Sequence, residues 1–355
     1  MSTEKKKISV ERLTNFIESA FISQGAQKEH ANICAQRMIE ADLQSMHGHG
    51  IFRLPAYMKR VKEGGYNLNP NIRHVRETAN SALVDGDNGL GQVVVSHAVE
   101  LAIQKAKDNG MAWVGTRNSN HAGAGGAYAS MALQNDMIGM YMAVGNANHM
   151  PPWGGVDRLL STNPICFAIP AGKEYPILLD MATTVVSYGK VKVHAQSGEK
   201  LPEGWMVDRK GRPLTDPKLI EEGFLVPIGS YKGYGLNFVV GALAGVLNTS
   251  AFGSSVIDFN KDFHTPTNSG QTFIAMRVDL FREVEDFKRE MDLRIREIKD
   301  STPMKSGTEI LLPGEIGFKE RPRMIEEGIP VSESLLSQLM KLADEFELSD
   351  NLADV

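Results

Sequence analysis

The sequence predicts an α/β protein with a smaller helical unit built from both ends of the chain. Helical periodicity dominates the first 65 residues, and short apolar strands alternate with helices from residue 81 onward. A last amphipathic helix, 332–346, is expected to return to the N-terminal helices. At 355 residues the chain is long for a single core. We therefore expect a helical domain, 1–78 joined by 320–355, and an α/β domain, 79–319.

The N-terminal unit is predicted to be helical and to end in a polar connector. Apolar residues at helical spacing indicate three helices: 10–25, 27–43 and a third that begins at Pro55 and ends near Gly64. Proline suits the first turn of a helix, because its missing N–H has no partner there. The segment 66–77 is polar and contains Pro and Asn, so we expect a connector.

From residue 81 onward the sequence predicts strands and helices in alternation. The expected strands are 82–85, 111–116, 138–144, 164–169 and 177–180. The expected helices are 93–109, closed by Gly110, then 123–134, 231–247 and 278–299. The segment 190–227 carries proline, glycine and charge, and is predicted to be a long excursion from the sheet.

The composition narrows the possible functions. A formal net charge of -5 gives no support to a nucleic-acid or membrane-surface role, and the run Lys5-Lys6-Lys7 is expected to belong to a solvated N-terminus. The start of the chain lacks the apolar core of a signal peptide, and the apolar segment 236–247 is too short for a bilayer core of about 30 Å. Cys34 and Cys166 make neither a disulfide framework nor a zinc cluster. We expect a reduced, cytoplasmic protein.

The stretch 41–57, ADLQSMHGHGIFRLPAY, is the first candidate for chemistry. His49 and Arg53 are four residues apart, so a compact bend could direct both side chains into one cavity. Arginine grips a carboxylate through two parallel hydrogen bonds, and histidine exchanges protons near neutral pH. The alternative is a helix entry with a surface histidine and a solvated arginine.

Polar clusters follow two of the predicted strands, where α/β proteins commonly hold ligands. The first is Asn118-Ser119-Asn120-His121, in which His121 is a second candidate for proton transfer. The second is 180–184, in which Asp180 could orient an imidazole or an amide and the threonines could bind phosphate. Lys232, at the start of a predicted helix, could also receive a phosphate. For the two clusters that follow strands, the alternative is a simple helix cap, with a surface histidine in the first.

The sequence contains no complete nucleotide-binding fingerprint. The Rossmann pattern G-x-G-x-x-G fails at Gly89, where Val94 takes the third place, and at Gly123, where Tyr128 does. A P-loop is also absent from the sequence. His47 and His49, with His121 or Asp42, could in principle ligate zinc, but glycine between the two histidines makes the pair flexible and no H-E-x-x-H motif supports it. We expect no metal.

Eight short motifs occur in one order along nearly the whole chain. They are AD-(x6)-HG-(x2)-RLP-x-Y, NSNH-x-G, TNP-(x2)-FA-x-P, DMAT-(x5)-GK, KGYGL, GQ-x-F-x-A, PGE and R-(x4)-GIP. Together they resemble the malate/L-lactate dehydrogenase family that lacks a Rossmann fold. That family also contains ureidoglycolate and sulfolactate dehydrogenases, diketogulonate reductases and piperideine-2-carboxylate reductases.

The resemblance implies a non-Rossmann nicotinamide-binding α/β domain and a role for each site residue. His49 is the acid/base candidate and His121 competes for that role, while Arg53 anchors the substrate carboxylate. Further substrate contacts are expected from Tyr57, Asn120 and Asn146. Cofactor contacts are expected from Asp180, Met181, Ala182, Thr183, Tyr231, Lys232, Gly314 and Glu315.

The predicted reaction is reversible hydride transfer between NAD(P)H and C2 of a small 2-oxo or 2-hydroxy acid, with NADH slightly favoured. The resemblance also implies a homodimer, with the helical domain serving substrate and dimer contacts. Gly48 replaces a common serine, Ser161 replaces a common glycine, and His149 has no assigned role, so the substrate stays open. The alternatives are a cyclic imine reductase, a zinc-dependent hydrolase built on His47, His49 and His121, and a non-catalytic binding protein.

Overall fold

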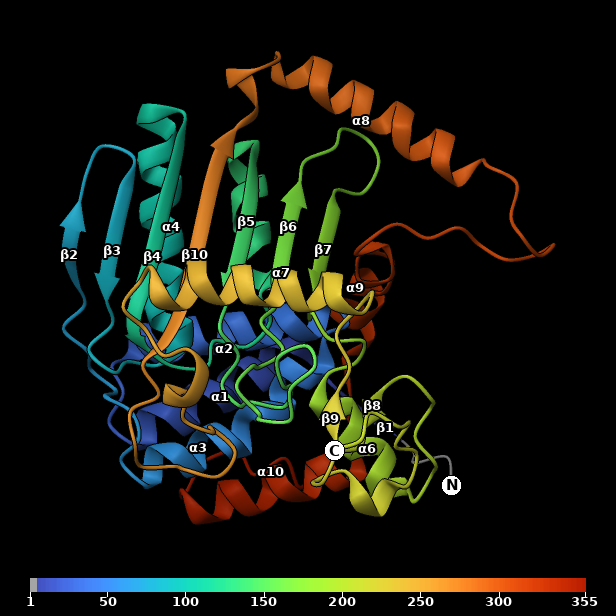
Figure 1. The fold of residues 1–355 in the computed structure, drawn as a ribbon. Helices are drawn as coiled ribbons and strands as arrows, with labels where there is room; N and C mark the ends of the chain where they lie inside the picture. The colour runs from blue at the N-terminus through green and yellow to red at the C-terminus, as the bar shows by residue number, and fades with distance from the viewer. Residues whose placement is uncertain (1–4) are drawn as a thin grey trace.

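A computed structural model describes residues 5–355 and confirms the predicted α/β class. A seven-stranded sheet has the order β2-β3-β4-β10-β5-β6-β7 (Figure 1). Its strands are β2 (Arg73–Glu77), β3 (Ser81–Asp85), β4 (Met111–Ser119), β5 (Met137–Ala143), β6 (Ile165–Ile169), β7 (Ile177–Met181) and β10 (Ser269–Arg277). The strands β3 and β4 pair in parallel, and every other pair in this sheet is antiparallel.

Helices cover both faces of the sheet. On one face α4 (Gly91–Asn109) packs along β4, followed by the short α5 (Gly126–Ala129) and a 3-10 turn, Ser130–Asn135. On the other face α7 (Tyr231–Gly241) crosses in front of the strands and continues as a π-helical turn, Ala242–Val246 (Figure 1). The helix α8 (Val284–Lys299) lies across one end of the sheet. The site described below lies at the opposite end, where the sheet meets the N-terminal helices.

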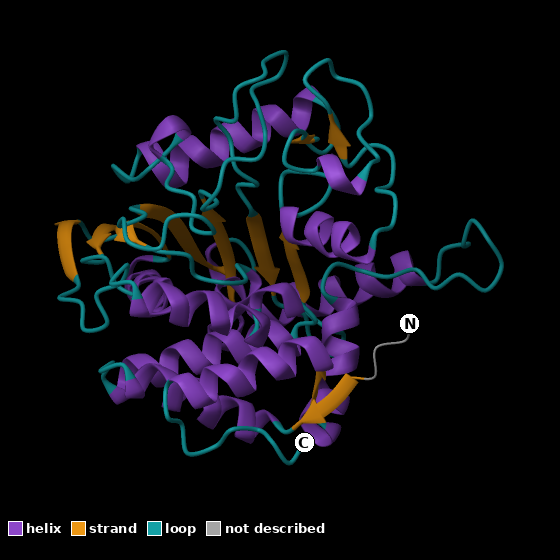
Figure 2. Cartoon of the chain, turned by 90° about the horizontal axis from the view of Figure 1, so that it is seen from below, coloured by secondary structure: helices purple, strands orange, loops and turns teal. Residues whose placement is uncertain are grey.

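The helical part draws on both ends of the chain, as the blue and red helices of Figure 1 show, and Figure 2 shows its helices gathered on one side of the sheet. It contains α1 (Val10–Ser23), α2 (Lys28–Leu43), α3 (Leu54–Lys62), α9 (Glu315–Glu327) and α10 (Glu333–Glu345). One apolar cluster joins buried residues of α1, α2 and α3 to buried residues of α10, among them Phe16, Met38 and Leu339. The strand β1 (Lys5–Ile8) pairs with β11 (Ile329–Ser332), which ties the two ends together. This packing supports the predicted grouping of both chain ends in one helical domain. The boundaries at 78 and 319 stay a prediction.

Several predicted elements were wrong or incomplete. The central strand β10 was missed, the predicted connector contains the edge strand β2, and the basic run at residues 5–7 forms β1. The predicted helix 278–299 begins only at Val284, and the 313–315 segment opens the unpredicted helix α9. The excursion 190–227 contains most of α6 (Tyr188–Ser197) and the strands β8 (Met206–Val207) and β9 (Phe224–Leu225), and this region has a small apolar core of its own. Among the described residues, no helix combines the length and apolar character of a membrane span.

Candidate active site

The turn between α2 and α3 carries the first candidate residues. Two 3-10 turns, His47–His49 and Ile51–Arg53, lead into α3, and Pro55 lies in the first turn of that helix. The predicted placement of His49 and Arg53 on a bend before the helix is therefore confirmed. Both side chains are half-buried, so neither is the solvated surface group of the alternative interpretation.

The buried carboxylate of Asp42 fixes this turn. Its Oδ2 accepts the Ile51 backbone N–H at 2.8 Å, and its Oδ1 lies 3.0 Å from Nδ1 of His47. Burial raises the pKa of Asp42, while the hydrogen bonds from His47 and Ile51 oppose the rise. A Cβ at position 50 would lie 2.0 Å from Asp42 Oδ2, so only glycine lets the backbone come this close. Asp42 thus sets the path of the chain between His49 and Arg53.

We expect Gly50→Ala to lower kcat/KM by about a hundredfold, because displacement of a catalytic turn by about 1 Å has an effect of that order. Steady-state kinetics with the preferred substrate would measure it. Gly48→Ala is the matched control, since a Cβ at position 48 meets nothing within 4 Å. Equal loss in both variants, or no loss at Gly50→Ala, would contradict the role given to Asp42.

His121 lies beside His49, just beyond the end of β4. The two imidazole rings stack with centroids 5.7 Å apart. Nδ1 of His121 lies 2.7 Å from the Tyr57 hydroxyl and accepts the Gly123 backbone N–H at 3.3 Å. Because a backbone N–H can only donate, Nδ1 is an acceptor, and the proton of the neutral imidazole is on Nε2. His121 is therefore arranged as a hydrogen-bond donor through Nε2.

The Arg53 guanidinium has no carboxylate within ion-pair distance among residues 5–355. Its Nε donates to the Gly48 carbonyl at 2.9 Å, which directs the end of the side chain. Burial lowers the pKa of Arg53. A half-buried cation without a counter-ion is costly, and a bound anion would remove that cost. This is the arrangement expected of a site that binds a carboxylate.

Burial and the Arg53 charge control the protonation of both histidines. Burial lowers the pKa of His49 to about 3, and the Arg53 charge contributes to the shift. Burial, Arg53 and His49 lower the pKa of His121 well below its usual range. Both imidazoles are thus neutral near pH 7 without a ligand. Nδ1 of His49 is buried and has no hydrogen-bond partner among residues 5–355, so a bound ligand could supply one.

Phe259 completes the aromatic wall and was missed by the sequence analysis. Its ring stacks on His121 with centroids 5.3 Å apart and meets Tyr57 edge-on at 5.9 Å. The predicted residue Asn146 supports this wall, because its backbone carbonyl accepts the Phe259 N–H at 2.8 Å and its side chain donates to Ser269. No local pattern around Phe259 indicates its role, since its partners are more than a hundred residues away in sequence.

The structure places Asn120 behind the site. The side chain is fully buried, its Nδ2 donates to the carbonyls of Asn88 and Gly89, and its Oδ1 accepts from Thr267 at 2.8 Å. All of its hydrogen-bonding groups are used within the protein. We therefore propose a supporting role for Asn120, in place of the substrate contact predicted from the sequence.

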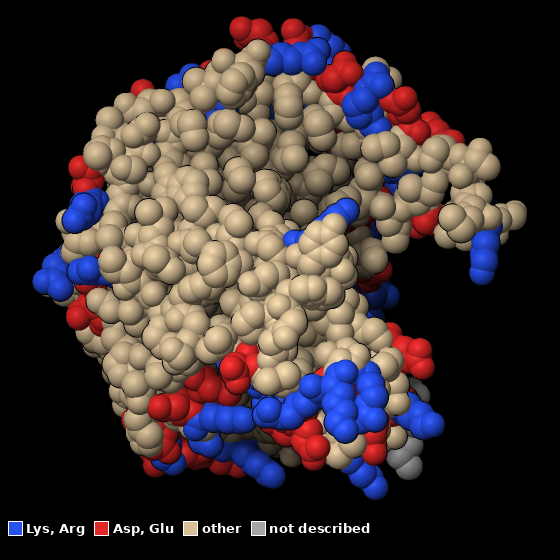
Figure 3. All heavy atoms as spheres, viewed as in Figure 1, with Lys and Arg blue, Asp and Glu red and all other residues tan. Residues whose placement is uncertain are grey.

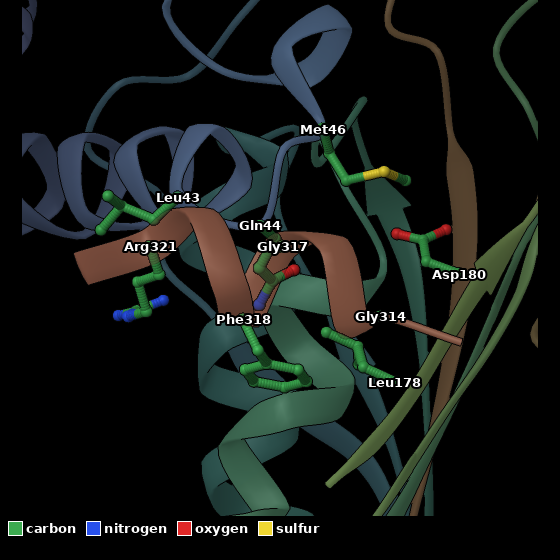
Figure 4. A pocket seen from close by; sticks show the side chains of 9 residues that line it. All are labelled: Leu43, Gln44, Met46, Leu178, Asp180, Gly314, Gly317, Phe318 and Arg321. Carbon is green, nitrogen blue, oxygen red and sulfur yellow. The ribbon is translucent and has the colours of Figure 1, made fainter. Parts of the chain in front are cut away.

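Asp180 lies at a cavity between the sheet and the helices (Figure 4). The cavity has a volume of about 100 Å³ and is lined by Leu43, Gln44, Met46, Leu178, Asp180, Gly314, Gly317, Phe318 and Arg321. Oδ2 of Asp180 accepts the Gly126 N–H at 2.7 Å, and burial raises the pKa of this carboxyl. Oε1 of Gln44 is buried without a partner among residues 5–355. Two acceptors here suit a ligand with N–H donors, such as the carboxamide of a nicotinamide.

The remaining predicted cofactor residues fall into two groups. Met181 and Ala182 follow Asp180 and are half-buried, and Gly314 lines the same cavity. Tyr231 and Lys232 are exposed at the N-terminus of α7, where backbone N–H groups and the helix dipole favour a phosphate. Lys232 makes no ion pair within residues 5–355. The residue types in both groups would suit a dinucleotide with its phosphates near α7.

Thr183 and Glu315 are occupied within the protein. Thr183 is fully buried, and its hydroxyl donates to Thr162 O at 2.9 Å and accepts from Asn237 Nδ2 at 2.8 Å. Glu315 forms ion pairs with Lys299 and Lys319, and its pKa is lowered to about 2 although burial alone would raise it. We therefore propose that both residues shape the cofactor region from behind.

Residues 5–355 contain no group of three or more His, Cys, Asp or Glu side chains arranged to hold a metal ion. His47 is engaged with Asp42, and the two free thiols, Cys34 and Cys166, are buried. The geometry therefore gives the zinc-dependent hydrolase no ligand set.

Comparisons with known proteins cover almost the whole chain. A family model described as malate/L-lactate dehydrogenase matches residues 8–340. The L-sulfolactate dehydrogenase of Methanocaldococcus jannaschii is 39% identical over 97% of this chain and 96% of its own. The malate dehydrogenase of Pyrococcus horikoshii is 38% identical over 95% of this chain and 94% of its own. A solved structure of the Methanocaldococcus jannaschii sulfolactate dehydrogenase superposes with a TM-score of 0.89 at 37% identity, covering 97% of this chain and 98% of that chain.

Proposed function

Since the chain belongs to the malate/L-lactate dehydrogenase family, we propose that its site binds the carboxylate of a small 2-oxo or 2-hydroxy acid on Arg53. The enzyme class, a nicotinamide-dependent hydroxy acid dehydrogenase, follows from the family and confirms the predicted reaction type. One observation supports the substrate class: Arg53 is half-buried and has no anionic partner among residues 5–355. A guanidinium matches a carboxylate through two parallel hydrogen bonds.

The bound nicotinamide supplies or accepts the hydride at C2, and the protein positions the substrate and moves the proton. Arg53 fixes the carboxylate, so the neighbouring C2 oxygen lies toward the stacked imidazoles. Nε2–H of His121 donates to that oxygen. His49, whose Nδ1 has no other partner, exchanges the proton with it. Phe259 and Tyr57 exclude water from this side of the site.

Substrate binding prepares His49 for the reductive direction. In the free site burial lowers the pKa of His49 and the Arg53 charge adds to the effect. A substrate carboxylate on Arg53 offsets that charge, so the pKa of His49 rises and the imidazole can take up a proton. In the oxidative direction the neutral imidazole accepts the proton of the substrate hydroxyl directly. One residue thus serves both directions.

We expect opposite pH dependences for the two directions. Since kcat/KM reports the free enzyme, in which the pKa of His49 is about 3, the protonated form needed for reduction declines about tenfold per pH unit above that value. We therefore expect kcat/KM for 2-oxo acid reduction to fall from pH 5 to pH 8. The oxidative kcat/KM should stay flat, because the base is already deprotonated. Cofactor affinity across the same range is the control, and a transition near pH 6.5 in both directions would contradict the assignment.

We propose NAD or NADP as the cofactor, with NADH slightly favoured, held by Asp180, Met181, Ala182, Gly314, Tyr231 and Lys232. The acceptors at the Asp180 cavity and the phosphate-binding character of the α7 N-terminus support this placement. The exposed Trp153 meets the Tyr231 ring edge-on at 6.4 Å, which gives that end of α7 an aromatic wall.

We propose a homodimer, as the family resemblance implies. The outer face of α7 and its π-helical continuation exposes Phe238, Val239, Val246 and Leu247. Figure 3 shows a broad uncharged area on this side of the molecule, with charged side chains gathered toward its edges. An exposed apolar area of this kind is typical of a subunit contact. The cytoplasmic location stays a prediction.

A substrate panel tests the function. Oxidation of NADH and NADPH would be followed with pyruvate, oxaloacetate, sulfopyruvate, 2-oxoglutarate, diketogulonate and a cyclic imino acid. We expect turnover of one 2-oxo acid with one of the two cofactors. Preference for the imino acid would establish the cyclic imine reductase instead. Zinc in the purified protein, together with a hydrolytic activity that chelation abolishes, would favour the zinc-dependent hydrolase. Absence of turnover with all substrates and of cofactor binding would overturn the proposal.

A further inference from the structure

Gln92 is a buried amide whose polar atoms form no hydrogen bond of normal geometry within residues 5–355. It lies in the first turn of α4, and only 1% of its surface is exposed. A buried polar group without a hydrogen bond lowers the stability of the fold, whereas an apolar side chain of similar size would not carry this penalty. A side chain that lowers the stability of the fold in this way is a candidate for a functional role.

The start of α4 packs directly behind His121. A Cβ on Gly91 would lie 2.4 Å from the backbone oxygens of Asn120 and His121, so helix and turn are in close contact. The Gln92 carboxamide lies against the Tyr57 hydroxyl. Burial raises the pKa of that hydroxyl, and Arg53 and the Gln92 carboxamide oppose the rise. Gln92 is thus a polar group next to Tyr57.

Tyr57 connects Gln92 to His121. The Tyr57 hydroxyl lies 2.7 Å from Nδ1 of His121, and the ring itself is fully buried. The Gly123 N–H already marks Nδ1 as an acceptor, although its distance of 3.3 Å is long. The stronger constraint on Nδ1 is therefore the direction of the Tyr57 O–H, which rotates freely unless another donor occupies its oxygen. The Gln92 amide nitrogen makes no other hydrogen bond within residues 5–355, so it is available as that donor.

We propose that Gln92 is a positioning residue for the reaction: its amide N–H donates to the Tyr57 oxygen, which keeps the Tyr57 O–H directed at Nδ1 of His121 and the His121 proton on Nε2. This inference rests on the proposed function, in which Nε2–H of His121 donates to the substrate oxygen. Gln92 touches neither substrate nor cofactor and acts through Tyr57. Other charged or titratable groups lie near the hydrogen-bonded series Gln92, Tyr57 and His121. They are Arg53 and His49 beside His121, and Cys34 near Tyr57.

The first test replaces the amide with an apolar group of the same length. We expect Gln92→Met to lower kcat about tenfold with little change in KM for the cofactor, while thermal stability is kept or increased because an unpaired polar group is removed. Ser96→Ala is the matched control. Ser96 lies one turn further along α4, is also buried, and its hydroxyl is unpartnered among residues 5–355, but it belongs to no contact with Tyr57. This control should keep full activity.

A double-mutant cycle distinguishes an effect of Gln92 that passes through Tyr57 from a general disturbance of the site. If Gln92 acts through the Tyr57 hydroxyl, Gln92→Met should cause no further loss in a Tyr57→Phe background. Additive losses would overturn the proposal, as would a Gln92→Met enzyme within twofold of wild type. Should Gln92→Met fail to fold, the shorter Gln92→Leu takes its place in the cycle.

A spectroscopic measurement tests the inference independently of turnover. In protein labelled with ¹⁵N-histidine, the two ring nitrogens of His121 report which one carries the proton. We expect the Nε2–H form in wild type and in Ser96→Ala, and an increased Nδ1–H fraction in Gln92→Met. An unchanged tautomer in Gln92→Met overturns the inference even if the enzyme is active. Absence of turnover in wild type, with the expected tautomer shift, would instead overturn the proposed function alone.

Discussion

We expect Arg53→Leu to lower kcat/KM for the preferred 2-oxo acid by about a thousandfold. Two charge-assisted hydrogen bonds to the substrate carboxylate are lost, each of about 1.5–3 kcal/mol, and about 1.4 kcal/mol corresponds to a tenfold change. Steady-state kinetics at saturating cofactor would measure it. The protein should remain folded, because the Arg53 guanidinium forms no ion pair within residues 5–355 and its hydrogen bond to Gly48 O is the contact it gives up.

A neutral substrate provides the control for this prediction. The methyl ester of the same 2-oxo acid lacks the carboxylate, so wild type should discriminate strongly against it and Arg53→Leu should not. Arg53→Lys keeps the charge and loses the planar pair of donors, so we expect an intermediate loss. If Arg53→Leu lowers kcat/KM equally for the acid and for the ester, the arginine has a structural role and the carboxylate is bound elsewhere.

The local part of this site could be predicted from the sequence, because its chemistry lies within single segments. The bend before α3 follows from glycine and proline around His49 and Arg53, and these residue types suit a carboxylate and a proton. The segment after β4 was found in the same way, although the strand runs on to Ser119 and buries Asn120. A polar side chain that the sequence pattern places at the site can instead be buried, with all of its hydrogen bonds formed inside the protein. Residue spacing does not reveal this.

The contributions from distant segments could not be predicted. Phe259 and Gln92 reach the site only because loops and helices far apart in sequence pack against His121. The same applies to β10, which joins β4 to β5 in the middle of the sheet although it follows them by more than a hundred residues. Its short apolar run, with Gly270 at the start, is ambiguous between a strand and the beginning of the charged helix that follows. The secondary structure of such a segment is determined by the strands with which it can pair, and not by its local preference.

We expect His49→Ala to lower kcat by about a hundredfold to ten-thousandfold, the usual contribution of a positioned proton-transfer group. Cofactor binding, followed by NADH fluorescence, should be nearly unchanged, because the His49 side chain is not among those that line the Asp180 cavity. The comparison variant is His121→Ala. If His121 only donates a hydrogen bond to the substrate oxygen, its loss should be smaller and should appear in both directions of the reaction.

The two histidines differ in one physical respect that decides this assignment. Nδ1 of His121 is held by Tyr57 and Gly123, so within this contact network the Tyr57 hydroxyl, whose pKa burial raises, is the group that could replace a proton lost from the ring. Nδ1 of His49 has no partner among residues 5–355, so this ring can gain or lose a proton without displacing another group. A ring with a free nitrogen suits proton exchange, and a ring with a fixed acceptor suits donation. If His49→Ala keeps most of its turnover and His121→Ala does not, the proton must travel through Tyr57, and the two roles are exchanged.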